Sequence, residues 1–230
     1  MPKHIIPIFL SCNKDSAERT IEAVTHIANR ASEAFTYYVH ILHTDLPNSL
    51  LQRACKMAHK GCFIFFENVG PWLESARSLF PMPNCYEDPS HFYFYVADMF
   101  PEYRKAIYLS TEGASAADID ALYATDLGDC LVGAFPTART AGVELTTDHK
   151  EPSSPLLAAL YDPSVILLNC DSLRHNHMSD RFLRATAQSQ GKNLPGTVFL
   201  SQLCRDRVQC LEKTHVETNH TFQTSPAPAV

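Results

Sequence analysis

The sequence predicts an α/β fold in which a mostly parallel central sheet is flanked by helices. Short apolar runs of strand length alternate along the chain with segments whose apolar residues recur at helical spacing, and the links between them are short. A chain of 230 residues, 45% of them hydrophobic and 19% charged, can bury the core that such a sheet needs. Ligands of these folds bind beyond the carboxyl ends of the strands, so site residues are expected there.

The first part of the chain supplies three strands and two helices. Its apolar runs predict strands at residues 5–10, 37–43 and 62–66. Asp15 and Glu18 have the spacing of a capping box, which predicts a helix after the first strand with Asp15 as its N-cap. Apolar residues at helical spacing predict a second helix over 49–60.

The second part of the chain continues the alternation. Further apolar runs predict strands at residues 106–109, 130–135 and 164–169. We expect helices at 91–100, 116–123 and 178–190, a helix and a loop in the proline-rich segment 70–90, and a polar loop at 139–155. Residues 213–230 have the composition of a loosely held tail, which leaves a single domain over 5–212.

Composition excludes several classes of function. A net charge of -6 and a pI near 6 give no long-range attraction for nucleic acid or anionic lipid. No apolar run approaches the roughly 20 residues that span a bilayer, and the first residues lack a small-residue cleavage site, so we expect a cytoplasmic protein without a membrane span. The eight cysteines include no CxxC pair, which argues against a zinc site or a disulfide framework.

Common catalytic motifs are missing from the sequence. It contains no G-x-S-x-G elbow and no G-x-x-x-x-G-K-[ST] phosphate loop. A triad of serine, histidine and aspartate that assembles in space stays open at this stage, because spacing along the chain does not test it.

The stretch FPEYRKAIYLSTEGASAADIDALYATDLGDCLVGAF (100–135) resembles the central segment of glycosyltransferase family 8, in which F-P-x-Y-D-K-x-L-Y-L-D-x-D-x-x-V precedes a short helix and L-Y-x-x-D-L-G-D. IIPIFLSCNKDSAERT (5–20) is similar to the family's first strand, P-I-V-x-A-x-D-D-N-Y, and YDPSVILLNCDSLR (161–174) resembles its F-N-S-G-V-x-L-I-N-L-x-x-W-R. The resemblance implies a GT-A, Rossmann-like fold, a nucleotide-sugar donor, a manganese ion and retaining transfer of a hexose.

The metal-binding motifs of the family are altered in this sequence. The two aspartates of D-x-D fall on Ser110 and Glu112, and a serine hydroxyl is a neutral, weak substitute for a carboxylate. Glu112 alone makes a weak metal site, and its simpler interpretation is a solvated residue in a glycine-containing turn. The family's last ligand is the histidine of H-x-x-G-x-x-K-P-W. His220 could pair with Glu112 in a remnant metal site or be an exposed tail histidine, because no G-x-x-K-P-W follows it or His215.

The donor-binding positions are altered as well. D-D-N at the first strand becomes residues 13–15, where Asn13 could still bond a base edge. The family's donor-contacting arginine aligns with Tyr93, its N-S-G with residues 162–164 and its D-Q-D with residues 195–197. The candidate donor-site residues are therefore Asn13, Asp15, Tyr93, Ser110, Glu112 and Asp162.

Two other histidine pairs are assigned no metal. His40 and His43 lie three apart on a predicted strand and so face opposite sides of the sheet. We expect nothing acidic to accompany either this pair or the pair His175 and His177.

Two functions are consistent with these observations. In the first, the chain is a family 8 fold of glycan or cell-surface polysaccharide assembly whose metal and donor site is degraded, a non-catalytic or very weakly binding module that needs no cofactor. In the second, it is an active hexosyltransferase that uses UDP-glucose or UDP-galactose in a rebuilt site, either with Mn²⁺ or without a metal. The aromatic runs at 91–96 and 63–66 favour a homo-oligomer or a partner glycosyltransferase, and UDP-sugar is expected to bind only weakly.

Overall fold

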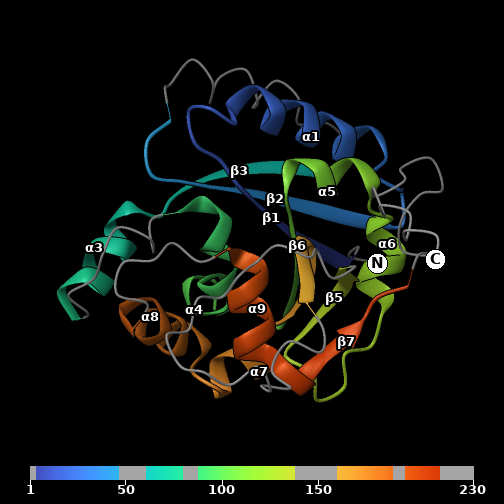
Figure 1. Ribbon diagram of the computed structural model, residues 1–230. Coiled ribbons are helices and arrows are strands. Elements are labelled where there is room, and N and C mark those ends of the chain that lie inside the picture. The colour runs from blue at the N-terminus through green and yellow to red at the C-terminus, as the bar shows by residue number, and fades with distance from the viewer. Residues whose placement is uncertain (1–3, 47–60, 80–87, 138–159, 189–194, 213–230) are drawn as a thin grey trace, which may run out of the picture.

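The computed structural model describes residues 4–46, 61–79, 88–137, 160–188 and 195–212. Its centre is a seven-stranded sheet with the strand order β3-β2-β1-β4-β6-β5-β7 (Figure 1). The strands are β1 (His4–Ser11), β2 (Phe35–His43), β3 (Cys62–Asn68), β4 (Lys105–Leu109), β5 (Val132–Thr137), β6 (Leu160–Asn169) and β7 (Val208–Cys210).

Helices occupy the connections between these strands. The α-helices are α1 (Ala17–Asn29), α3 (Gly70–Leu79), α4 (Val96–Met99), α5 (Thr111–Ala116), α6 (Ile119–Ala124), α7 (Cys170–His175), α8 (Met178–Gln188) and α9 (Gly196–Cys204). Two short 3₁₀ helices, η2 (Pro89–Phe94) and η4 (Arg205–Arg207), complete the described elements. Among the residues that the structure describes, no helix is long and apolar enough to cross a lipid bilayer.

The predicted fold class is confirmed. Four of the six strand pairings are parallel, and β6 runs antiparallel to both of its neighbours, β4 and β5. All six predicted strands are present, although β5 begins two residues later than the run at 130–135 and β6 begins four residues earlier than the run at 164–169. The three-residue β7 was not predicted, because a strand of that length leaves no periodic pattern.

Each face of the sheet is buried by its own set of helices. Side chains alternate between the faces along a strand, so Leu10 joins the cluster beneath α1, α5 and α6, while Phe9 joins the cluster with η2, α4, α7, α8 and α9. Figure 1 shows α1 and α5 on one side of the sheet and α4, α8 and α9 on the other. The aromatic run HFYFYV (91–96) is buried on the second face, and its residues 92–96 belong to the second cluster.

The helix predictions were partly correct. The segment 91–100 is helical and buried, but it divides into η2 and α4 at Tyr95. The helix predicted at 116–123 forms as α6, and a separate helix, α5, precedes it where a turn was expected. The helix at 178–190 is confirmed as far as Gln188. The predicted helix at 49–60, the loop at 139–155 and the tail at 213–230 lie outside the described residues, and the domain boundaries stay a prediction.

Candidate functional site

The carboxyl ends of β1 and β4 form the expected edge for a site. These strands are parallel neighbours, with Leu10 opposite Leu109. Residues 11–13 and 110–112 therefore leave the sheet at the same edge, and the sequence-predicted residues Asn13, Ser110 and Glu112 lie along it.

Asn13 forms the turn that leads into α1. Its Oδ1 accepts the backbone N–H of Ser16 at 2.8 Å, and its own N–H donates to Ser16 Oγ at 3.0 Å. Ser16 is the residue that precedes the helix, so the prediction of Asp15 as N-cap was wrong by one residue. The reciprocal Asn13–Ser16 pair closes a turn that contains Asp15 and delays the helix, which leaves Asp15 exposed.

Ser110 is the N-cap of α5. Its Oγ accepts the N–H of Gly113 at 3.0 Å, and its own N–H donates to the carbonyl of Ser164 at 2.8 Å. The chain thus passes from β4 into a helix that lies against β6. A serine in this position satisfies one of the free N–H groups of a helix start, which is a structural role.

Glu112 lies in the first turn of α5 rather than in a glycine-containing turn. Its side chain is 67% exposed, and its Oε1 lies 3.5 Å from a guanidinium nitrogen of Arg19 on α1. Partial burial alone would raise the pKa of this carboxyl. Hydrogen bonds from its own backbone N–H and from the hydroxyls of Thr111 and Ser110, together with the charge of Arg19, instead hold the pKa below its usual value. Glu112 is therefore an ionised carboxylate with a cation as its neighbour.

Three of the aligned donor positions converge elsewhere, around Gly196. A Cβ placed on Gly196 would lie 3.5 Å from Tyr93 Oη and 3.6 Å from Pro163 Cγ, and Tyr93 Oη donates to the Gly196 carbonyl at 3.0 Å. The sequence alignment thus identified positions that are neighbours in space, although about a hundred residues separate Tyr93 from Gly196. The groups that meet at Gly196 are the Tyr93 hydroxyl, the His91 imidazole and the Pro163 ring.

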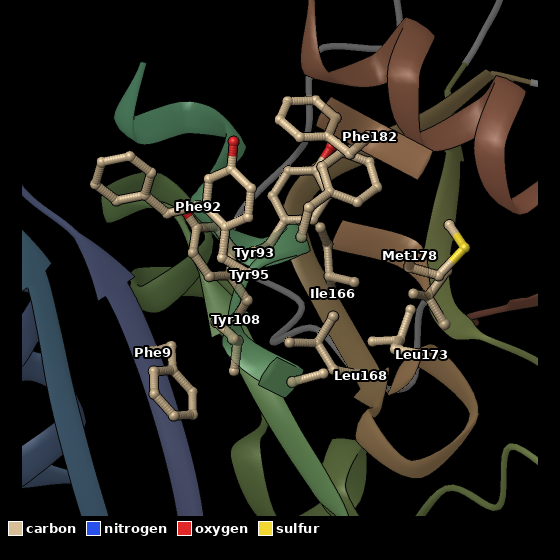
Figure 2. Close-up of a cluster of buried hydrophobic side chains, with 14 of the residues drawn as sticks. Phe9, Phe92, Tyr93, Tyr95, Tyr108, Ile166, Leu168, Leu173, Met178 and Phe182 are labelled. Atoms are coloured by element: carbon tan, nitrogen blue, oxygen red, sulfur yellow. The ribbon is translucent and has the colours of Figure 1, made fainter. Parts of the chain in front are cut away.

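Tyr93 belongs to the core. It is 1% exposed, and its ring lies 4.3 Å from that of Phe94 and 5.4 Å from that of Tyr108, centroid to centroid. Burial raises the pKa of its hydroxyl well above the usual value. Figure 2 shows Tyr93 among the buried side chains, between Tyr108 and Phe182. A packed, neutral side chain therefore stands where the resemblance places the family's arginine.

Asp162 and Pro163 lie at an irregularity of β6. The ladder between β5 and β6 pairs Ala134 with Ile166 but the next residue, Phe135, with Asp162, so the residues between them bulge out. A bulge tolerates Pro163, which cannot donate to a ladder. Asp162 Oδ1 accepts the N–H of Ser164 at 2.8 Å, so its carboxylate supports the bulge.

Four polar residues at the same edge as Ser110 were not among the site residues predicted from the sequence. They are Ser11, Lys14, Asp45 and Tyr108. Ser11 Oγ lies 2.6 Å from Tyr108 Oη, and Tyr108 donates to the carbonyl of Pro89 at 3.0 Å, which ties β1, β4 and η2 together. Lys14 forms an ion pair with Asp45, which follows β2. Ser11 and Asp45 lie at or just beyond strand ends, so a search of every strand end would have found them.

The sequence matches the model of one protein family, described as "Glycosyl transferase family 8", over residues 7–217. This is most of the 230-residue chain. The chain belongs to this family. A comparison with curated proteins gives no match.

Solved glycosyltransferase structures share the fold of this family 8 chain. It is similar to the apo structure of the bifunctional glycosyltransferase WbbM, with a TM-score of 0.68 and 15% identity, over 90% of this chain and 39% of that one. The glycosyltransferase GlyE of Streptococcus pneumoniae TIGR4 gives 0.62 and 16%, over 93% and 46%. The galactosyltransferase LgtC, solved with donor and acceptor sugar analogues, gives 0.59 and 15%, over 89% and 73%. The chain thus spans less than half of the WbbM and GlyE chains.

The residues at the D-x-D position of this family 8 chain do not fit a manganese ion. A divalent cation binds several oxygen ligands, preferably carboxylates, but Ser110 Oγ is bonded to a backbone N–H and Glu112 lies against Arg19. Over the described ranges, no three side chains of His, Cys, Asp or Glu gather as a metal site. The proposed ligand His220 lies outside those ranges, as does His215.

The two histidines of β2 face opposite sides of the sheet, as predicted, but one of them has an acidic neighbour that was not expected. His40 stacks between Phe9 and Phe65 on one face of the sheet, and His43 lies edge-on to Phe66 on the other. The expectation that nothing acidic accompanies them was wrong, because Glu67 Oε1 of the neighbouring β3 lies 3.0 Å from His40 Nδ1. The pairing depends on strand register, which spacing along the chain does not reveal.

Proposed function

We propose that this chain is a family 8 module of glycan or cell-surface polysaccharide assembly that is non-catalytic or binds a donor only very weakly. We propose that it acts in the cytoplasm. One observation carries the proposal. The segment at the D-x-D position is the first turn of α5, with the Ser110 hydroxyl bonded to the Gly113 N–H and the Glu112 carboxylate beside Arg19.

Charge stabilisation is the reason that this observation weighs against transfer. Departure of a nucleotide diphosphate from a sugar builds negative charge on the leaving phosphate, and enzymes of this kind gain most of their rate enhancement by stabilising such charge. The single carboxylate of Glu112 would have to leave Arg19 to hold a cation. Ser110 would contribute only a neutral oxygen.

The donor positions support the same proposal. Tyr93, Pro163 and Gly196, none of which carries a charge, meet at the place where three aligned family motifs converge. Tyr93 is fully packed and its hydroxyl already donates to Gly196, so it offers no cation to a phosphate.

A metal-independent hexosyltransferase is the second candidate, and the position of two cations favours it. Arg19 lies against the D-x-D position, and Lys14 follows the adjacent strand end. Their side chains are 63% and 66% exposed, so both could turn toward a diphosphate. Each is now paired with a carboxylate, Glu112 or Asp45, which a donor would have to displace.

Ligand-dependent thermal stability separates these possibilities. We would titrate the full chain with UDP, UDP-glucose and UDP-galactose, each with and without Mn²⁺, and measure the melting temperature. A ligand at about 100 times its Kd stabilises the fold by roughly 2.7 kcal/mol. For a domain of this size, each kcal/mol corresponds to about 2–4 °C.

The proposal predicts a shift below about 1 °C in every arm at sub-millimolar ligand. A larger shift that needs Mn²⁺ and disappears in Glu112→Ala would contradict it and identify Glu112 as a metal ligand. A larger shift without Mn²⁺ that disappears in Arg19→Ala would establish the metal-independent donor site instead. Glu33→Ala, which removes an exposed carboxylate far from this edge, is the matched control.

A further inference from the structure

The β3 strand is an open edge of the sheet. It pairs with β2 on one side, and among the described strands none pairs with its other side. The N–H of Tyr37 donates to the Gly61 carbonyl and that of Val69 to the His43 carbonyl, both at 2.8 Å. Odd-numbered residues of β3 therefore direct their backbone groups toward β2, because N–H and C=O of one residue point the same way in a strand. The even-numbered residues direct theirs outward.

Aromatic side chains are exposed beside this open edge. Phe63 is 49% exposed and Phe65 37%, and the Tyr38 ring of β2 lies 5.7 and 5.2 Å from theirs, centroid to centroid. We call Tyr38, Phe63 and Phe65 the aromatic patch. Natural edge strands are usually protected by lysine, proline or a bulge, but β3 (CFIFFEN) has neither lysine nor proline and pairs with β2 without a register shift.

We propose that a second copy of this chain pairs antiparallel with β3, about a two-fold axis at Phe65. This register is the one that pairs all seven residues of Cys62–Asn68 with their counterparts. It places Phe65 opposite Phe65 of the second copy as a non-hydrogen-bonded pair. Ile64 and Phe66, which direct their backbone groups outward, exchange hydrogen bonds with Phe66 and Ile64 of the second copy.

The side chains of β3 are complementary in this register. On one side of the sheet Ile64 faces Phe66 of the second copy, and on the other side Phe65 faces Phe65 of the second copy. Glu67 is the only charged residue of β3, and it lies opposite Phe63 of the second copy instead of another carboxylate. The two aromatic patches become continuous across the axis, because diagonal neighbours on adjacent strands are within reach of aromatic rings. A second copy thus covers both the open backbone groups and the exposed rings.

Sedimentation velocity of the full chain over a dilution series tests the pairing. We expect a reversible dimer whose proportion rises with concentration. Phe65→Lys places like charges opposite each other and should weaken the dimer about tenfold or more. Ile5→Lys is the matched control, because Ile5 is similarly exposed (40%) but lies on β1, away from the edge, and this variant should dimerise like the parent.

Ile64→Pro distinguishes strand pairing from contact between the patches alone. It removes an outward N–H that the β2–β3 ladder does not use, and it leaves the aromatic patch intact. We expect a monomer with an unchanged far-UV circular dichroism spectrum. This variant also tests the proposal if Phe65→Lys does not fold.

Cysteine cross-linking tests the register. Phe65→Cys should form a disulfide between copies under mild oxidation, identified by peptide mapping, because facing residues have suitable Cα separations. Phe63→Cys should not, because residue 63 lies opposite Glu67 of the second copy, four residues along the strand from residue 63 of that copy. A chain that stays monomeric at every concentration, a dimer that persists in both Phe65→Lys and Ile64→Pro, or cross-linking through residue 63 instead of 65 would each overturn the proposal.

Discussion

Substitution of Gly113 by alanine tests why the D-x-D position is helical in this chain. Gly113 lies where α5 crosses β6, and a Cβ on it would be 2.0 Å from the Ser164 carbonyl oxygen and 2.9 Å from Val165 Cγ2. The obstructing atoms belong largely to the backbone of a central strand. They cannot rotate away as the end of a flexible side chain could.

The size of the effect follows from three contributions. Overpacking of a well-packed site costs roughly 1–3 kcal/mol, and backbone contact at 2.0 Å belongs at the upper end. Moving α5 away also strains the hydrogen bond from Ser110 N–H to Ser164, worth about 1 kcal/mol. Alanine returns about 1 kcal/mol through its higher helix propensity. The net loss is about 3 kcal/mol, which corresponds to a melting temperature lower by about 6–12 °C.

Differential scanning calorimetry of Gly113→Ala measures this loss. Ser115→Ala on the same helix is the matched control, and it should stay within about 0.5 kcal/mol of the parent. If Gly113→Ala melted within about 1 °C of the parent, the close contact of α5 with β6 would be wrong.

Three further predictions concern the core and its polar groups. Tyr93→Arg restores the family's cation and should lower the melting temperature by about 6 °C or more in a thermal melt. The side chain of Tyr93 is 1% exposed, so the substitution buries an unpaired charge in the apolar core. Burial lowers the pKa of His40, and Glu67 opposes this with a smaller effect. The neutral ring therefore stabilises the fold above the unfolded pKa of about 6.5, and this stability is lost as the pH falls below that value. Melting temperatures measured from about pH 7.5 to about 5.5 should fall less steeply in His40→Gln than in the parent. Arg174 donates to the carbonyls of residues 97 and 103 at 2.7 and 3.0 Å, so Arg174→Ala should cost about 3 kcal/mol in urea unfolding, whereas the 87% exposed Arg104 should cost less than about 1 when replaced by alanine.

Local pattern was sufficient for most of the secondary structure. Apolar runs identified six strands because a buried strand needs apolar side chains along its length. The same signal could not place the start of β5, since residues 130 and 131 are apolar but precede the ladder. It also missed α5, because the sequence around Gly113 has no helical periodicity and this helix depends on its contact with β6.

The sequence by itself determined the fold class and the family resemblance, and it predicts that Ser110 takes the place of the first aspartate of D-x-D. Each of these depends on residue identity or on spacing within one segment. Only the tertiary structure decided that Glu112 lies beside Arg19, that Tyr93 meets Gly196, and that Glu67 bonds His40. These contacts join residues on different elements, and strand order and register, which arise from packing the whole chain, determine which side chains become neighbours.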